Sequence, residues 1–406
     1  MKILITVCDF FINNFINLFV FLINLFIWRD KKVLLFGGWF GEKFADNSRF
    51  LFEFLSENRK KYNLKKVIWI TRNKNVYNTV SSLGYDVLLA NSFKSYYYHL
   101  KSGVHFICNN SSFHGQKKDI VTVLSFGAKK VQLWHGVGIK SCGRLNKKNP
   151  NSFLTLLYYN FVNRFGQPGM WGFCYYLVTS EENKRVAIED FAALEKRVII
   201  AQYPRLISSY KLTPNEKNII DKLIFEKKKK KIILFVPTFR ANNSNYISPQ
   251  SINGFVSFLS INSFLWVQKK HSADKNLVFL NDQNENILEL SPDFDVNLLY
   301  DIVDLVITDY SSASSDAIYK DKLTLEYCPD FDYYKSLDRG FVCDFQKYHV
   351  FEPVTDYTKL FQSIVLRFQN HPKDYKNHLI TKKFLFGSKA WNMDDVYNKI
   401  KEVARI

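Results

Sequence analysis

Short apolar runs separated by helical stretches recur along most of this 406-residue chain, and they constrain its fold more than any other feature. The first run, residues 33–37, ends in glycine, as a first buried strand of a parallel sheet should. A helix over residues 48–58 follows it, with Asp46 or Asn47 near its cap. Further strands of this series are predicted at residues 67–71, 87–90, 104–108, 131–134, 176–179 and 198–201. The alternation of strand and helix indicates a mainly parallel sheet.

A second series of alternating strands and helices begins after a polar stretch that follows Arg205. A helix over residues 297–303 is expected within this series, and residues 356–406 look helical. The predicted strands are residues 232–236, 264–268, 277–280, 305–308 and 323–326. The sequence therefore predicts two doubly wound, Rossmann-like α/β domains with a cleft between them.

The length supports this division, because 406 residues exceed what one ordinary core holds. We expect a membrane-associating helix at residues 1–30 and a first domain at residues 31–208. The second domain is expected at residues 209–385, and a C-terminal helix at residues 386–406 is expected to brace the two domains.

The N-terminal segment differs from the rest, because residues 3–28 carry only one charge, Asp9. At 100° per residue its polar side chains share one helical face, which is typical of an amphipathic helix lying in a membrane interface. These polar residues are Thr6, Asp9, Asn13, Asn17 and Asn24. Arg29, Lys31 and Lys32 follow and would meet anionic headgroups. Two alternatives stay open for this segment: a membrane span, and a helix packed on the first domain or on another subunit. A secretory signal is disfavoured, because no small-residue cleavage site follows the apolar stretch.

The net charge of +18 suits a polyanionic partner: nucleic acid, an anionic membrane or a polyanionic substrate. Part of the excess is accounted for by solvated lysines such as those of residues 227–231. The six cysteines include no C-x-x-C pair, so a reducing compartment is expected and no zinc knuckle is indicated. No motif has metal-ligand spacing; we expect no required cofactor, and a divalent metal stays open.

Five short motifs each place a proton carrier, a cation or a hydroxyl group beside a predicted strand end. Strand ends facing a crevice are where open α/β sheets bind ligands. In chain order the motifs are Trp134-His135-Gly136, Tyr203-Pro204-Arg205, Pro237-Thr238-Phe239-Arg240, Lys269-Lys270-His271 and Thr308-Asp309-Tyr310-Ser311-Ser312. Together they indicate a site that handles phosphate groups.

Two of the motif residues are histidines. His135 follows a strand and precedes Gly136, which permits close approach of the backbone to a ligand. Histidine takes up a proton near neutral pH, so His135 is a candidate general base, with a structural role as the alternative. His271 lies beside Lys269 and Lys270 and is a candidate to donate to a diphosphate.

The remaining candidates are arginines and serines. Arg205 and Arg240 each follow a proline turn, and their guanidinium forks suit phosphate oxygens, with a surface ion pair as the alternative. Ser311 and Ser312 open a predicted helix whose N-terminus suits a phosphate, with ordinary capping as the alternative. Asp316, one turn into that helix, is a candidate to accept from ligand hydroxyl groups.

As an ordered set, these motifs resemble the CDP-glycerol glycerophosphotransferases, the teichoic-acid polymerase and primase type also found in capsule synthesis. The resemblance covers roughly residues 33–390 and includes the late Gly387-Ser388-Lys389-Ala390. Two departures leave the polyol and the acceptor open. Val137-Gly138-Ile139-Lys140 stands where the family usually has Thr-Pro-Leu-Lys, and Ala313-Ser314-Ser315 replaces bulky apolar residues.

The resemblance implies a GT-B fold and transfer of a polyol phosphate from a CDP-activated donor to a hydroxyl group, with release of CMP. It implies that His135 is the general base. It places around the donor diphosphate and polyol Arg205, Thr238, Lys269, His271, Ser311, Ser312 and Asp316. We expect His135 and His271 to be the catalytic residues, and we expect the donor-binding residues to include Trp134, Gly136, Pro237, Arg240 and Lys270 as well. The expected donor is CDP-glycerol, with CDP-ribitol or another CDP-alditol as alternatives.

The expected acceptor is a lipid- or polymer-linked hydroxyl group at the cytoplasmic face of the cell membrane, and the expected partners include an anionic membrane surface but no nucleic acid. Two other classes stay open. One is a GT-B glycosyltransferase that uses a nucleotide sugar or CMP-Kdo, and the other is a catalytically silent polyanion-binding protein. The oligomeric state, and the choice between primase and polymerase, are left undecided.

Overall fold

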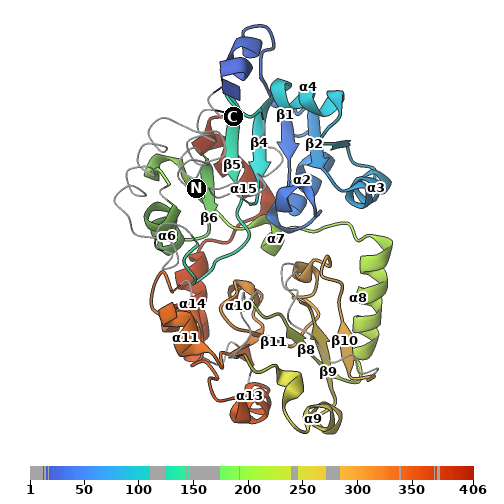
Figure 1. Ribbon diagram of the computed structural model, residues 1–406, viewed down its shortest axis with the longest axis vertical. Helices are drawn as coiled ribbons and strands as arrows, with labels where there is room; N and C mark the ends of the chain where they lie inside the picture. The colour runs from blue at the N-terminus through green and yellow to red at the C-terminus, as the bar shows by residue number, and fades with distance from the viewer. Residues whose placement is uncertain are drawn as a thin grey trace. The chain divides into compact units, whose positions relative to one another are not determined.

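The computed structural model describes residues 12, 15, 16, 18–109, 124–142, 145, 174–191, 193–238, 246–270, 284–337, 340–369, 371, 372 and 375–406. The chain forms two compact units (Figure 1). The first comprises Met1–His135, Pro150–Thr213 and Lys389–Ile406, and the second comprises Gly136–Asn149 and Pro214–Ser388. The chain thus passes from the first unit to the second directly after His135, returns, and passes again after Thr213.

The first unit is built on a seven-stranded sheet in the order β3-β2-β1-β4-β5-β6-β7. All its neighbouring strands are parallel, as the alternation of strands and helices predicts. The strands are β1 (Asp30–Phe36), β2 (Lys66–Thr71), β3 (Val87–Leu89), β4 (Ser102–Ile107), β5 (Lys129–Gln132), β6 (Tyr175–Val178) and β7 (Val198–Ile200). The order reverses between β1 and β4, which makes this the switch point where doubly wound sheets bind ligands.

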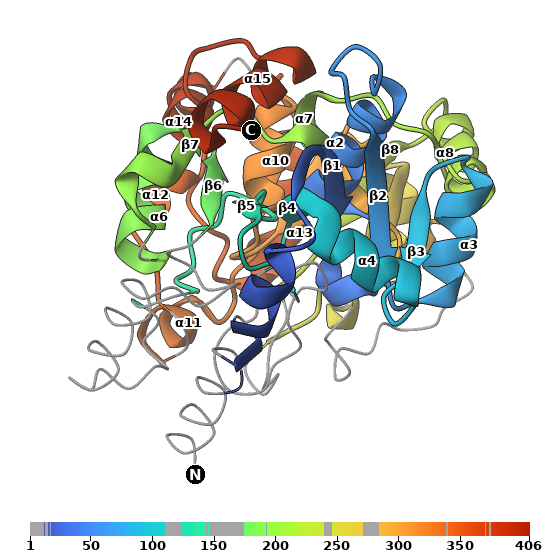
Figure 2. The ribbon, with the colours of Figure 1, turned by 90° about the horizontal axis from the view of Figure 1, so that it is seen from above.

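After the N-terminal segment, the described part of this unit contains six labelled helices. They are α2 (Asp46–Glu57), α3 (Lys74–Ser82), α4 (Phe93–Lys101), α6 (Glu181–Phe191), α7 (Pro204–Ile207) and α15 (Met393–Ala404). The helix α2 packs against β2 and α7, and α4 packs against β1 and β3 (Figure 2). The last helix, α15, packs against β6 and β7 of this unit. Its expected bracing of both domains stays a prediction.

The second unit has a five-stranded parallel sheet in the order β10-β9-β8-β11-β12, with its switch point between β8 and β11. The strands are β8 (Lys231–Phe235), β9 (Phe264–Gln268), β10 (Ile287–Glu289), β11 (Leu305–Thr308) and β12 (Leu323–Glu326). The strand expected at residues 277–280 lies outside the described residues, and the edge strand β10 was not predicted. The helix expected over residues 297–303 is wrong: only a short 3-10 helix, η6 (Val296–Leu298), forms there.

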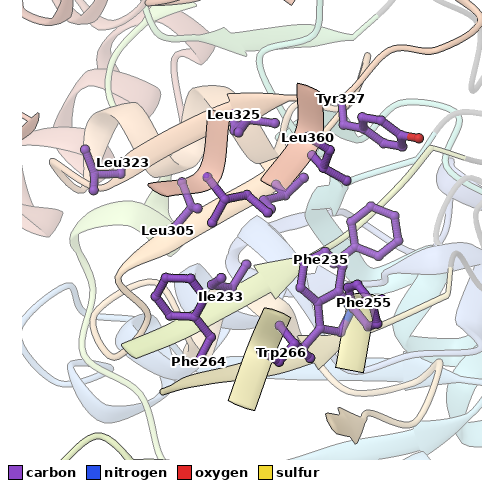
Figure 3. Close-up of a cluster of buried hydrophobic side chains, with 13 residues drawn as sticks. Ile233, Phe235, Phe255, Phe264, Trp266, Leu305, Leu323, Leu325, Tyr327 and Leu360 are labelled. Carbon is purple, nitrogen blue, oxygen red and sulfur yellow. The ribbon is translucent and has the colours of Figure 1, made fainter. Parts of the chain in front are cut away.

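Aromatic side chains hold this second sheet to its helices. Trp266 of β9 is fully buried; its ring lies 5.1 Å from that of Phe235 and 5.0 Å, at 89°, from that of Phe255 on α9 (Phe255–Ile261) (Figure 3). Burial of such rings stabilises each by about 1.5–3 kcal/mol relative to exposure. The packing fixes β8 and β9, whose carboxyl ends lead into the Pro-Thr and Lys-Lys motifs.

The C-terminal region is helical, as the sequence predicts. Helices α13 (Leu360–Arg367) and α14 (Lys376–Phe386) belong to the second unit, where α13 packs against β12 and α14 against α10 (Ala313–Tyr319). His378 and Lys382 of α14 both contact the Asp321 carboxylate, at 2.9 and 2.7 Å. These contacts tie the C-terminal end of α10 to α14.

The N-terminal segment is helical over residues 18–24, and most of its apolar side chains there are exposed. Val20 is fully buried, and the Asn24 side chain donates to the Phe126 carbonyl at 3.3 Å. Asn24 was expected on a water-facing side, and that expectation is wrong for this residue because its amide is used against the first unit. The rest of the predicted polar face lies outside the described residues. Exposed side chains in this segment are Ile12, Phe15, Leu18, Phe19, Phe21, Leu22, Leu25, Phe26 and Trp28.

Arg29 anchors the end of this segment. Its guanidinium donates to four backbone carbonyls, those of His99, Ser102, Leu124 and Phe126. Burial lowers the pKa of Arg29 to about 10. Within the described part of the chain, no helix has both the length and the apolar character needed to cross a membrane.

Candidate functional site

The switch point of the first unit carries polar backbone and side-chain groups. The loop after β1 and the loop after β4 meet there, because the Asn109 side chain accepts the Trp39 N–H at 3.0 Å. The Trp39 ring also lies 5.6 Å from the ring of His135, which follows β5. His135, which belongs to the first of the five motifs, therefore lies at the edge of the sheet where ligands are expected to bind.

His135 is held in one tautomer. Its Nδ1 lies 3.1 Å from the Cys108 carbonyl, which only accepts hydrogen bonds, so in the neutral ring Nδ1 carries the proton. The lone pair is then on Nε2. A neutral histidine with its lone pair on Nε2 is the form that a general base requires.

Trp134, directly before it, has a left-handed backbone with φ +55°. For a bulky residue this costs on the order of 1–3 kcal/mol and persists only where neighbouring groups enforce it. The Trp134 N–H donates to the Gln132 side chain at 3.0 Å. On the other side, its carbonyl accepts from the Asn47 side chain, also at 3.0 Å.

Asn47 is a residue whose role the sequence did not reveal beyond helix capping. It is fully buried; its Nδ2 donates to the carbonyls of Leu133 and Trp134, and its Oδ1 accepts the Arg205 N–H at 3.3 Å. One side chain thus joins the Trp-His-Gly and Tyr-Pro-Arg motifs. The only signal in the sequence was its place next to Asp46, directly before an apolar helix.

Arg205 is not a surface residue. Its side chain is 1% exposed and its guanidinium lies 2.5 Å from the Asp46 carboxylate. Asp46 has φ +68°, so its backbone, like that of Trp134, lies in the left-handed region. The predicted contact of Arg205 with a donor diphosphate stays a prediction, and within the first unit the side chain holds Asp46.

At the switch point of the second unit, two loops are joined by Asp309. Both of its carboxylate oxygens accept the Thr238 N–H, at 2.9 and 3.0 Å, and one accepts the Tyr310 N–H. Asp309 is 1% exposed and Thr238 is 5% exposed. The Thr308 hydroxyl adds a bond to the Val236 carbonyl at 2.7 Å. The Pro237-Thr238 turn is thereby fixed next to the serine motif.

The serines of that motif divide into two pairs. Ser314 donates to the Glu326 carboxylate and Ser315 donates to the Val137 carbonyl, so both are used in packing. Ser311 accepts the Ala313 N–H at 3.3 Å, whereas the Ser312 hydroxyl makes no capping bond although it is the N-cap residue.

The helix α10 that follows these serines has only 7 residues, and this limits its macrodipole. The predicted contact of Ser311 and Ser312 with a phosphate therefore depends on their hydroxyl groups more than on the helix end, and it stays a prediction. Asp316 lies in the first turn of α10 and is 3% exposed.

The other predicted residues are placed as follows. Lys269 follows β9 and its N–H donates to the Phe235 carbonyl, which continues the sheet toward the site. Lys270 lies 3.6 Å from the Glu289 carboxylate at the edge strand β10. His271 and Arg240 lie outside the described residues, so their roles stay predictions.

The segment that begins with Gly136 belongs to the second unit. Besides the bond from Ser315 to Val137, Ile139 accepts the Val342 N–H at 2.8 Å, and Lys140 forms an antiparallel bridge with Phe341. Among the described residues, no group of three or more histidine, cysteine or acidic side chains is arranged to hold a metal ion.

The fold is similar to that of solved transferases. The wall teichoic acid polymerase TagF superposes with a TM-score of 0.67 and 19% identity, covering 92% of this chain and 90% of that one. A variant of the same polymerase soaked with CDPG gives a TM-score of 0.67 at 17% identity, over 93% and 89% of the two chains. The fold class is that of two doubly wound α/β units, each with polar groups at its switch point, where such sheets bind ligands.

The chain belongs to the CDP-glycerol:poly(glycerophosphate) glycerophosphotransferase family, whose model matches residues 19–400. It is 27% identical over 329 residues to the teichoic acid poly(glycerol phosphate) polymerase of Bacillus spizizenii, covering 79% of each chain. It is 29% identical over 219 residues to the teichoic acid glycerol-phosphate primase of Bacillus subtilis, covering 53% of each. The chain is therefore a CDP-glycerol transferase enzyme, and the resemblance carried by its motifs is confirmed.

Proposed function

We propose that this enzyme transfers glycerol phosphate from CDP-glycerol to a hydroxyl group of a lipid- or polymer-linked cell-surface acceptor and releases CMP. The single observation that carries this proposal is the His135 ring, whose Nδ1 lies 3.1 Å from a carbonyl at a switch point. That bond puts the lone pair of the neutral ring on Nε2, the atom that we propose takes the proton of an attacking hydroxyl group.

In the proposed reaction the acceptor oxygen attacks the phosphorus that bears glycerol. A new phosphorus–oxygen bond to the acceptor forms, and the bond from that phosphorus to the bridging oxygen of CMP breaks. The acceptor proton passes to Nε2 of His135, and the bridging oxygen leaves as part of the CMP phosphate. Such transfers depend on positioning and on neutralising charge around phosphorus.

We assign that neutralisation to the second unit. Its Thr238 turn, its Ser311 and Ser312 hydroxyl groups and Lys269 lie at or near the carboxyl ends of β8, β11 and β9. Hydroxyl and backbone N–H donors with a lysine suit a diphosphate without a metal ion. Arg240, Lys270 and His271 are proposed to complete this set, and the Asp316 carboxylate is proposed to accept from hydroxyl groups of the polyol. We propose that no cofactor is required.

We place the enzyme at the cytoplasmic face of the cell membrane, held there by its N-terminal segment. The support is the outward-facing apolar side of this helix, with Phe15 72% exposed and Phe26 86% exposed. An interfacial helix buries such side chains among acyl chains. Lys32, exposed near the start of β1, would face anionic headgroups.

The test is to incubate the full chain with CDP-glycerol, CDP-ribitol and a panel of nucleotide sugars, each with a membrane-borne acceptor. We expect release of CMP together with incorporation of phosphate-linked glycerol. Preferred use of CDP-ribitol would change the polyol and leave the reaction intact. Incorporation of a sugar without phosphate would instead establish a glycosyltransferase and refute the proposal.

A further inference from the structure

The backbone of Trp134 lies in the left-handed region, and no glycine is present there to make this conformation easy. A non-glycine residue stays in this region only where surrounding groups fix it. Because His135 is the next residue along the chain, the direction of its ring depends directly on this turn. The groups that fix Trp134 therefore decide where the Nε2 lone pair points.

Two buried amide side chains clamp the Trp134 peptide groups from opposite directions. Gln132 accepts the Trp134 N–H at 3.0 Å, and Asn47 donates to the Trp134 carbonyl at 3.0 Å. Asn47 also donates to the Leu133 carbonyl at 3.1 Å. Both side chains are almost fully buried, so water does not compete for these carbonyls.

Asn47 is itself rigidly held. Its own N–H is bonded to the Asp46 carboxylate at 2.8 Å, and that carboxylate also accepts from the Arg205 guanidinium. The backbone N–H of Arg205 in turn donates to Asn47 Oδ1. The Asn47 amide is thereby oriented with its oxygen toward Arg205 and its two N–H donors toward the turn before His135.

We propose that Asn47 is a positioning residue for the transfer reaction: with Gln132 in support, it clamps the Trp134 turn and so sets the direction and the tautomer of His135. The inference rests on the proposed role of His135 as the base. It assigns to Asn47 no contact with donor or acceptor.

The test compares Asn47→Ala and Asn47→Asp with the wild-type chain and with Asn58→Ala. Asn58 ends the same helix and donates to one carbonyl of its own helix, Phe54, at 2.8 Å, so it is a matched control. We expect kcat to fall roughly 10- to 100-fold in both Asn47 variants, as displacement of a reacting group by about 1 Å does. The KM for CDP-glycerol should stay within about threefold of wild type, because the donor is assigned to the second unit.

A second readout does not depend on turnover. Nitrogen-15 NMR of protein labelled at its 8 histidines reports which ring nitrogen carries the proton, with His135→Ala used to assign the signal. We expect the Nδ1–H form of His135 in the wild type and in Asn58→Ala, and a mixture of tautomers in the Asn47 variants. A folded Asn47→Ala protein with kcat within twofold of wild type, or with an unchanged His135 signal, would overturn the proposal.

If the Asn47 variants do not fold, Gln132→Leu provides a second test of the proposed clamp on the Trp134 turn. This change removes the acceptor of the Trp134 N–H, at a cost in stability, and it also removes Gln132 Nε2, which has no hydrogen-bond partner among the described residues. The same loss of kcat and the same NMR change are expected. Wild-type kcat in folded Gln132→Leu would overturn the clamp.

Measuring the turnover of His135→Ala beside these variants distinguishes failure of the proposed base from failure of the proposed clamp. Wild-type turnover in His135→Ala would refute the proposed base, whereas an inactive His135→Ala with active Asn47 variants would refute only the clamp.

Discussion

Asp309 and Thr238 lie 71 residues apart in the chain, yet both oxygens of the Asp309 carboxylate accept the Thr238 N–H. Asp309 directly follows β11 and Thr238 lies in the loop after β8, so one buried side chain joins the two loops at the second switch point. A carboxylate suits this place because it only accepts hydrogen bonds, and the N–H groups of Thr238 and Tyr310 both donate.

Asp309→Asn should therefore weaken donor binding, because the new amide places N–H donors against backbone N–H groups. We expect the affinity for CDP-glycerol to fall by about 1–3 kcal/mol, measured by titration calorimetry. Asp293→Asn, at an exposed position of the same unit, is the control and should bind as the wild type does. Unchanged affinity in folded Asp309→Asn would show that the loop separation does not matter for the donor.

His135→Ala should reduce CMP release by roughly two to four orders of magnitude, because it removes the proposed base. Donor affinity should stay near the wild-type value. His371→Ala, at an exposed position in the second unit, serves as the control and should keep full activity. Near-wild-type turnover of His135→Ala would remove this residue from the mechanism.

Ser312→Ala separates capping from ligand binding, because the Ser312 hydroxyl makes no capping bond. We expect thermal stability to change by less than about 0.5 kcal/mol. Combined with Ser311→Ala, which removes the bond to the Ala313 N–H, the loss of stability should approach about 1 kcal/mol. Donor affinity of the double variant should fall by about 1–3 kcal/mol; affinity equal to wild type would leave these serines with a structural role only.

Deleting residues 1–28 should release the enzyme from membranes and leave CMP release with a short soluble acceptor intact. The deletion ends before Arg29 because that side chain bonds four carbonyls of the first unit. Replacing Phe15, Leu18, Phe19 and Leu22 by serine in the full chain should lower binding to anionic vesicles roughly tenfold or more.

The matched control for this prediction is the pair Leu379 and Ile380 on α14, 58% and 59% exposed, replaced by serine. These variants should bind vesicles as the wild type does. Full retention of the truncated protein on membranes would move the attachment to the basic surface of the folded units. Cleavage near Met1 by protease added outside right-side-out vesicles would instead establish a span.

Lys130 on β5 gives a prediction for stability against pH. It is 7% exposed, and burial lowers its pKa to about 8 from the usual 10.5. Below pH 8 the folded state holds a buried charge, so Lys130→Met should raise the free energy of unfolding at pH 7 by about 2–4 kcal/mol. Between about pH 8 and 10.5 the unfolded chain binds more protons at this residue, so wild-type stability rises and the difference between the two proteins shrinks.

Urea unfolding of both proteins from pH 7 to pH 10.5 measures this difference. Lys129→Met, one residue earlier and only partly buried, is the control and should change stability by less than about 0.5 kcal/mol. A gap between wild type and Lys130→Met that stays constant with pH would contradict the lowered pKa.

The fold could be predicted from the sequence where strands are continuous apolar runs. The bounds of β9, β11 and β12 agree with the prediction, because strands buried on both faces need such runs. The edge strand β10 has only 3 residues, too few for a pattern, and residues 297–303 contain helix-compatible residues that form only a short 3-10 turn.

Site residues could be predicted from the sequence only where the residue type itself indicates a chemical role. His135 was found because histidine and glycine follow a strand. Asn47 and Asp309 were missed as site residues, because their roles depend on contacts to residues 86 and 71 positions away. For the same reason the sequence could not identify Asp46, 159 positions away, as the partner of Arg205, or Val137 as the partner of Ser315.

The placement of α15 in the first unit has a consequence for synthesis of the chain. Its Asp394 carboxylate accepts from Lys61 and Tyr62, and Lys31 donates to the Arg405 carbonyl. Because α15 follows the second unit along the chain, the first unit cannot complete its packing until the second unit has been translated, whereas most of the second unit is one continuous stretch that is free to fold earlier. During that interval β6 and β7 lack their contacts with α15, and the apolar surface that the helix covers is exposed.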